Sequence, residues 1–258
     1  MNLRIGLSVK LRTYTHEERE SLAREISERI LSKYGDSVLS VFICGSTSKK
    51  LDRPYSDLEM VTIVRDGLKI PTKYYLYRGI VVEIDYFQEA SFLQAARRVT
   101  LNWPFEADEY RNRVTIFERE GWLGNLDRAV SSIDDAQMLE ALRASAVEMV
   151  EDLCSLRNAD ISNDLVGVRS RGLYLAGDIG KVVLLMNRRY VLTTSWFWKQ
   201  VFECPFKPER LQEFVEKMAG FVPTSGQEIT QSAELLCEVL VNMVKENGVS
   251  IESDDLLI

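Results

Sequence analysis

The chain has 258 residues, 46% hydrophobic and 28% charged, a composition typical of a globular protein able to bury one large core or two modest ones. Its formal net charge of −7 argues against binding of duplex nucleic acid, which needs a basic surface. No apolar run approaches the length that spans a bilayer, and the N-terminus lacks a signal peptide's apolar block. We therefore expect no membrane partner and a cytoplasmic location.

The four cysteines, Cys44, Cys154, Cys204 and Cys237, are far apart and form no C-x-x-C pair. Only one histidine accompanies them, so we expect neither a zinc site nor a disulfide framework. Free cysteine is commonly buried as a small hydrophobic side chain, which predicts four reduced structural thiols.

The first clear element along the chain is a helix. Thr15 and Glu18 fit a capping box, apolar residues then recur at helical spacing, and Gly35 closes the helix. Residues 38–44 form a short apolar, β-branched run that predicts a buried strand. A small polar loop, residues 45–56, follows it.

Two further strand signals follow the polar loop. Residues 57–64, DLEMVTIV, predict a second strand. Residues 74–87 predict a hairpin or a long strand that turns near Arg78 and Gly79.

Helical periodicity dominates from residue 126 onward. Helices are expected over residues 136–156, 173–186, 194–202, 209–218 and 232–246. Pro205, Pro208 and Pro223 fall between these segments, where proline interrupts a helix at least cost. We therefore predict an α+β fold with an α+β domain at residues 1–125 and a helical bundle domain at residues 126–258.

Acidic residues on the predicted strands carry the strongest chemical signal. Residues i and i+2 of a strand point to the same face, so Asp57 and Glu59 project side by side among apolar neighbours. Two such charges are unfavourable together unless a cation lies between them, and carboxylate and phosphate oxygens are the ligands that magnesium prefers. Glu83 and Asp85 repeat the acid-x-acid pattern, and a third carboxylate from there suits a second metal ion.

The Gly45-Ser46 pair supplies a complementary signal. Glycine lets the backbone approach a phosphate closely, and the Ser46 hydroxyl and the loop N–H groups can donate to phosphate oxygens. Lys49 adds a positive charge. Gly-Ser pairs are common and Asp-x-Glu can be a solvated sheet face, but their combination after a buried strand is more specific. Together they suit in-line displacement at phosphorus.

Gly-Ser, an acid-x-acid strand and a third strand acid resemble the polymerase-β-like nucleotidyltransferase superfamily. The segment GSTSKKLDRPYSDLEM, residues 45–60, is similar to the matching segment of the kanamycin nucleotidyltransferase family, the aminoglycoside 4′-O-nucleotidyltransferases. Further similarities lie at residues 28–38, 103–104, 146–158 and 190–195. The resemblance covers nearly the whole chain and implies a mixed-sheet nucleotidyltransferase domain followed by a helical domain for substrate binding and dimerisation.

The resemblance also implies roles for individual residues. Asp57, Glu59 and Glu83 become ligands of two Mg²⁺ ions, with Asp57 and Glu59 directly catalytic. Gly45, Ser46 and Lys49 bind the triphosphate of ATP or another nucleoside triphosphate. Glu151 matches the general base that takes a proton from the attacking hydroxyl.

The implied reaction transfers AMP from Mg-ATP to a hydroxyl of an aminoglycoside and releases pyrophosphate. The family acts as a homodimer with active sites between subunits. Several acids suit the substrate's ammonium groups: Asp66, Glu106, Asp108, Glu148 and Asp152. Of these, Glu148 and Asp152 are our candidates for substrate binding.

The chain departs from the family at three places. Ser48 and Lys49 replace a glycine and an arginine, and Ser155 replaces a lysine after the base. Residues 65–79 lack the family's acids, so the acceptor is open. One alternative is a nucleotidyltransferase that modifies a protein or an RNA end, as in toxin–antitoxin systems, and these usually lack a helical second half. Another is an inactive nucleotide-binding or regulatory protein, against which retention of all these acids argues.

Overall fold

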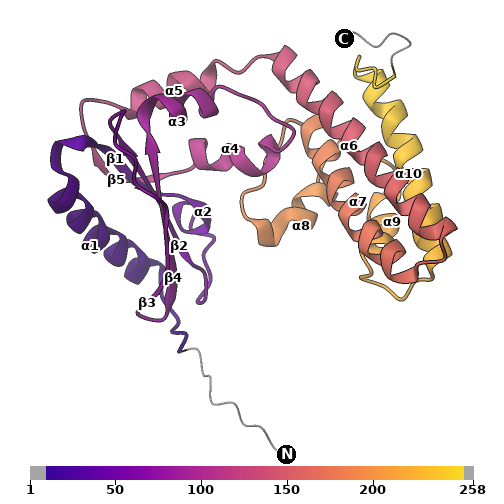
Figure 1. Cartoon of the computed structure of the whole chain (residues 1–258), viewed down its shortest axis with the longest axis horizontal. Helices are drawn as coiled ribbons and strands as arrows, with labels where there is room; N and C mark the ends of the chain where they lie inside the picture. The colour runs from indigo at the N-terminus through magenta and orange to yellow at the C-terminus, as the bar shows by residue number, and fades with distance from the viewer. Residues whose placement is uncertain (1–9, 253–258) are drawn as a thin grey trace, which may run out of the picture. The chain divides into compact units, whose positions relative to one another are not determined.

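The computed structural model describes residues 10–252, which form an α+β structure as the sequence predicts (Figure 1). The chain divides into two compact units. The first contains the residues up to Arg98 together with Asp108–Ser132, and the second contains Val99–Ala107 and the residues from Ile133 onward. A functional division near residue 125 stays a prediction.

The first unit is built on a sheet of five strands in the described part of the chain. The strands are β1 Val38–Ile43, β2 Leu58–Val64, β3 Lys73–Tyr77, β4 Ile80–Gln88 and β5 Val114–Glu118. Their order is β3-β4-β2-β1-β5. Strands β2 and β4 run parallel and the other neighbours run antiparallel, so the sheet is mixed, as the family resemblance implies.

Helix α1, His16–Tyr34, covers one face of the sheet (Figure 1). The predicted capping box is present, because the Thr15 hydroxyl accepts from the Glu18 N–H and the Glu18 carboxylate accepts from the Thr15 N–H. Gly35 follows the helix, as predicted, and begins a 3₁₀ turn, Gly35–Ser37. The apolar side of α1 packs on one face of the strands, which includes Leu58 and Met60 of β2.

Helices α3, Glu89–Ala96, and α5, Leu123–Ser131, cover the opposite face of the sheet (Figure 1). The core there includes Val61, Phe92 and Leu126. Successive strand residues alternate between faces, so the odd-numbered positions of β2 and β4 point toward this side.

The predicted hairpin is confirmed. Strands β3 and β4 are antiparallel, Tyr77 pairs with Ile80, and Arg78 and Gly79 form the turn with φ angles of 51° and 85°. Two successive positive φ angles are typical of the tight turns that match the twist of a hairpin.

Several elements differ from the sequence prediction. Residues 45–48 were expected as loop, but Gly45–Ser48 forms a single helical turn, α2. Strand β2 begins at Leu58, which leaves Asp57 just outside it. The helices α3, α4 (Trp103–Arg111) and α5 and the strand β5 were not predicted.

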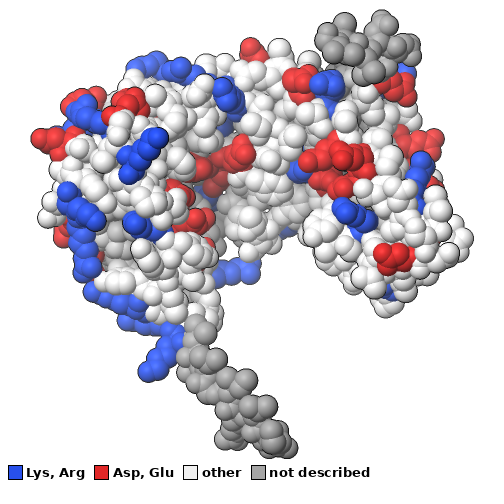
Figure 2. All heavy atoms as spheres, in the orientation of Figure 1, with Lys and Arg blue, Asp and Glu red and all other residues white. Residues whose placement is uncertain are grey.

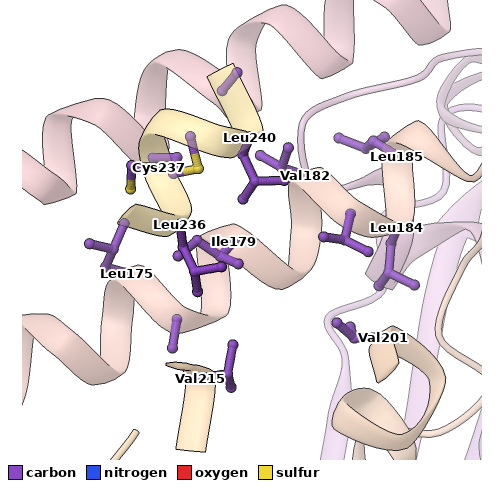
Figure 3. Close-up of a cluster of buried hydrophobic side chains, with 14 of the residues drawn as sticks. Leu175, Ile179, Val182, Leu184, Leu185, Val201, Val215, Leu236, Cys237 and Leu240 are labelled. Atoms are coloured by element: carbon purple, nitrogen blue, oxygen red, sulfur yellow. The ribbon is translucent and has the colours of Figure 1, made fainter. Parts of the chain in front are cut away.

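The second unit is helical, as predicted. Its helices are α6 Asp135–Ile161, α7 Leu165–Met186, the 3₁₀ turn Thr194–Trp196, α8 Phe197–Phe202, α9 Leu211–Met218 and α10 Gly226–Glu246. Helix α7 starts eight residues before the predicted position. Its buried side chains, including Ile179 and Val182, pack against Leu236 and Leu240 of α10 (Figure 3).

The thiols are unpaired, as predicted. All four cysteines lie within residues 10–252 and are free; Cys44, Cys204 and Cys237 are buried, whereas Cys154 is exposed. Within the same residues, no helix combines the length and the apolar character needed to cross a bilayer.

Candidate active site

The β2–β4 ladder brings two of the predicted acids together. Glu59 on β2 is the register partner of Glu83 on the parallel strand β4. Leu58 and Met60 belong to the core beneath α1, so Glu59 between them points to the opposite face. Glu83 shares that face because its neighbour Val82 also packs beneath α1.

Asp57 is close enough to Glu59 and Glu83 for its negative charge to raise the pKa of both. Burial, together with the negative charges of Asp57 and Glu83, raises the pKa of Glu59 to about 7. Burial also raises the pKa of Glu83, with smaller contributions from Asp85 and Asp57. The charged forms of Glu59 and Glu83 are therefore disfavoured, mainly by burial, and a bound cation would favour them.

These acids fit magnesium in donor type and in charge. Carboxylate oxygens are the donors that Mg²⁺ prefers, and Asp57, Glu59 and Glu83 concentrate negative charge at one edge of the β2–β4 pair. Their side chains do not form a closed ligand set. No three His, Cys, Asp or Glu side chains among residues 10–252 are grouped closely enough to hold a metal ion.

Gly45 lies directly against Glu59. Its φ angle is 62°, and a Cβ atom built on it would stand 1.6 Å from Glu59 Oε2. The backbone joins the same two segments, because the Cys44 N–H donates to the Glu59 carbonyl at 3.0 Å. Glycine is therefore required at this position both for the backbone conformation and for the space that the carboxylate occupies.

Lys49 is buried in an ion pair that the sequence did not predict. Its ammonium group donates to the Gly45 carbonyl oxygen and to the Asp108 carboxylate. The side chains of Lys49 and Asp108 are only 9% and 10% exposed. Asp108 also accepts from Asn112 Nδ2 at 2.7 Å, and the Ser48 hydroxyl donates to the Gly45 carbonyl at 2.9 Å. This network fixes the α2 turn to Asp108.

The remaining predicted residues lie on α6 of the helical unit. Glu151 is exposed, and Ser155 follows it one turn later. Glu148 and Asp152 join a cluster with Asp178 and Lys181 of α7, which the sequence did not single out. Figure 2 shows acidic side chains gathered over α6 and α7.

Lys181 connects the acids of this cluster. Its ammonium lies 2.5 Å from Glu148 Oε2 and 2.7 Å from Asp178 Oδ1. Burial, together with a hydrogen bond to Asp152, raises the pKa of Asp178 to about 6 against the opposing effect of Lys181. The sequence signal was Asp178 and Lys181 three residues apart in the otherwise apolar stretch of residues 175–186, a spacing that puts both on one face.

The comparisons with known proteins assign the chain to a family. The model of the KNTase C-terminal domain matches residues 120–250. The chain belongs to this family. The aminoglycoside nucleotidyltransferases (4′) of a Bacillus species and of Staphylococcus aureus are each 28% identical to it over 229 residues, 88% of this chain and 88% of theirs. The KNTase match and these relatives confirm the family resemblance and identify the chain as a nucleotidyltransferase enzyme.

A solved structure supports the fold independently. The nucleotidyltransferase-like protein from Exiguobacterium sibiricum 255-15 matches with a TM-score of 0.55 and 14% identity, covering 86% of this chain and 77% of that chain. At this level of identity the match shows a shared fold.

Proposed function

We propose that this enzyme transfers AMP from Mg-ATP to a hydroxyl of an aminoglycoside and releases pyrophosphate. The observation that carries the chemistry is Glu59, a carboxylate with a pKa raised to about 7, beside Asp57 and Glu83 and in contact with Gly45. The relatives named aminoglycoside nucleotidyltransferase (4′) support the acceptor class and the 4′ position.

The first unit binds the nucleotide in this proposal. Asp57, Glu59 and Glu83 hold two Mg²⁺ ions, which neutralise charge on the triphosphate and on the leaving pyrophosphate when bound. The N–H groups of Gly45 and Ser46 and the Ser46 hydroxyl donate to phosphate oxygens.

Lys49 contributes positive charge beside the same turn. Its ammonium group is already held in place by Asp108 and the Gly45 carbonyl. We therefore assign it a phosphate contact made from a fixed position rather than by a mobile side chain.

The helical unit supplies the base and the acceptor site. Glu151 takes the proton from the acceptor hydroxyl as its oxygen bonds to the α-phosphorus, and the bond from that phosphorus to the bridging oxygen of pyrophosphate breaks. Glu148 and Asp152 pair with substrate ammonium groups. Following the family resemblance, we propose a homodimer with active sites at the subunit interface, and sedimentation of the purified chain tests it.

The deciding experiment measures pyrophosphate release with ATP and Mg²⁺, with and without kanamycin, in the unsubstituted protein and in Glu151→Gln. We expect release that depends on kanamycin and falls by at least about a hundred-fold in the variant. Glu140→Gln, which changes an exposed acid on the same helix, is the control and keeps full activity. Release with no response to any aminoglycoside contradicts the proposed acceptor and directs the search to protein or RNA ends.

A further inference from the structure

The segment between α2 and β2 is held by one buried arginine. Arg19 of α1 is 1% exposed, an unusual environment for a guanidinium group. Its Nη2 donates to the carbonyl oxygens of Arg53 at 2.5 Å and Pro54 at 3.1 Å. Its Nε and Nη2 donate to the Ser56 carbonyl at 3.2 and 3.1 Å.

Asp52 fixes the guanidinium in this position. Its Oδ2 accepts from Arg19 Nη1 at 2.8 Å, and its Oδ1 hydrogen-bonds with His16 Nδ1 at 2.9 Å. The Asp52 side chain is 3% exposed. Arg19 Nη1 also donates to the Tyr14 carbonyl at 3.1 Å, so this arginine joins the start of α1 to the whole segment.

Residues 53–56, which Arg19 holds, lie immediately before Asp57 in the chain. Ser56 directly precedes Asp57, and Asp52 follows the α2 turn by only a few residues. Three carbonyl groups of residues 53–56 therefore converge on one cation immediately before the first candidate metal ligand. The Ser56 carbonyl group, which forms the peptide bond to Asp57, accepts from two nitrogens of this cation.

We propose that Arg19 is a positioning residue for Asp57, and that it acts by fixing residues 53–56 so that the Asp57 carboxylate enters the site beside Glu59. This inference rests on the proposed function for the metal role of Asp57. Arg19 touches neither nucleotide nor acceptor in it.

Lysine is the informative replacement at this position. Arg19→Lys keeps a cation beside Asp52, but an ammonium group has three donors on one nitrogen and cannot reproduce the five-donor fork of arginine. If it pairs with Asp52, at most two donors remain, so it cannot hold all three carbonyl groups of Arg53, Pro54 and Ser56.

The first measurement is hydrogen–deuterium exchange in the full-length protein. We expect the amides of residues 53–58 to exchange faster in Arg19→Lys, while the amides of β1 and of α7 stay protected. The control, Leu240→Ala, removes a fully buried side chain of the helical unit and lowers stability without touching the segment. Equal exchange at residues 53–58 in Arg19→Lys and in the unsubstituted protein overturns the inference.

The second measurement is Mn²⁺ affinity in the absence of nucleotide, followed by the spin-resonance signal of free Mn²⁺. Arg19→Lys is expected to weaken binding about ten-fold, the range for residues that orient a metal ligand. In the Asp57→Asn background the same substitution has little further effect, whereas in the Glu83→Gln background it keeps its full effect. Additive losses in both backgrounds assign Arg19 a general structural role and contradict the inference.

The two proposals fail in different ways. Absence of Mn²⁺ binding by the unsubstituted protein contradicts the proposed function and, with it, the metal part of this inference. Tight Mn²⁺ binding that Arg19→Lys leaves unchanged contradicts the inference alone.

Discussion

The Glu59 carboxylate occupies the space that a side chain on Gly45 would need, with 1.6 Å between Oε2 and the position of a Cβ atom. The candidate phosphate turn and the candidate metal ligand therefore form one packed unit. A side chain added at Gly45 therefore displaces the Glu59 carboxylate, which is the flexible part of the contact.

Gly45→Ala tests this contact. The methyl group overlaps the Glu59 carboxylate, so the side chain must rotate away from the site, and we expect kcat to fall at least about a hundred-fold while the fold persists. Gly67→Ala is a matched control, because Gly67 also has a positive φ of 92° but nothing within 4 Å of an added Cβ. Steady-state kinetics and thermal melting of both variants separate the overlap from the cost of the backbone conformation. Equal losses in the two variants contradict the prediction.

The raised pKa of Glu59 predicts a pH dependence of stability. The folded chain holds this proton more tightly than the unfolded chain, whose glutamate has a pKa of 4.5, so the free energy of unfolding rises as the pH falls from above 7 toward 4.5. In EDTA, the melting temperature of the unsubstituted protein should therefore be higher at pH 5.5 than at pH 8. Glu59→Gln should lose much of this difference, whereas the exposed control Glu140→Gln should retain it. Identical pH profiles for Glu59→Gln and the unsubstituted protein exclude Glu59 as the source.

The ion pair between Lys49 and Asp108 predicts that substitutions at the two residues affect stability and activity differently. Lys49→Met leaves the buried Asp108 carboxylate unpaired and should lower both stability and the kcat/KM for ATP. Adding Asp108→Asn removes the uncompensated charge, so the double variant should regain most of the stability and none of the catalytic loss. Urea denaturation and steady-state kinetics measure the two effects. Recovery of activity together with stability assigns Lys49 a structural role only.

The ion pairs of Lys181 with Glu148 and Asp178 predict that loss of Lys181 lowers stability less at low pH than at high pH. Lys181→Met leaves Asp178 buried without its cation, which should cost about 3 kcal/mol at pH 8. The pKa of Asp178 is already raised to about 6 and rises further without Lys181, so protonation near pH 5 removes the uncompensated charge and most of the defect. Urea denaturation of Lys181→Met at the two pH values makes the comparison. A defect of equal size at both values contradicts a charge-based origin.

Local signals account for the elements that the sequence predicted correctly. The capping box at Thr15 and Glu18 and the turn at Arg78 and Gly79 depend on residues a few positions apart, and both are present in the structure. The acid-x-acid pattern likewise marked Glu59 and Glu83 as candidate ligands, and the β2–β4 register makes them partners.

Non-local contacts account for the features that the sequence did not predict. Strand β5 pairs with β1, more than 70 residues earlier in the chain, and has only five residues to carry a strand signal. The partners of Lys49 and Arg19, Asp108 and Asp52, lie 59 and 33 residues away from them. Sequence spacing carries no information on such pairs, so the residues that support the site were missed even where the candidate ligands were found.

Strands β2 and β4 keep one continuous parallel register, from Leu58 opposite Val82 to Val64 opposite Gln88. This ladder sets Glu59 opposite Glu83, whereas the intervening residues 65–79 return the chain to the start of β4 and include the edge strand β3. Residues 65–72 lie outside both strands, so they can change without altering the pairing of Glu59 with Glu83.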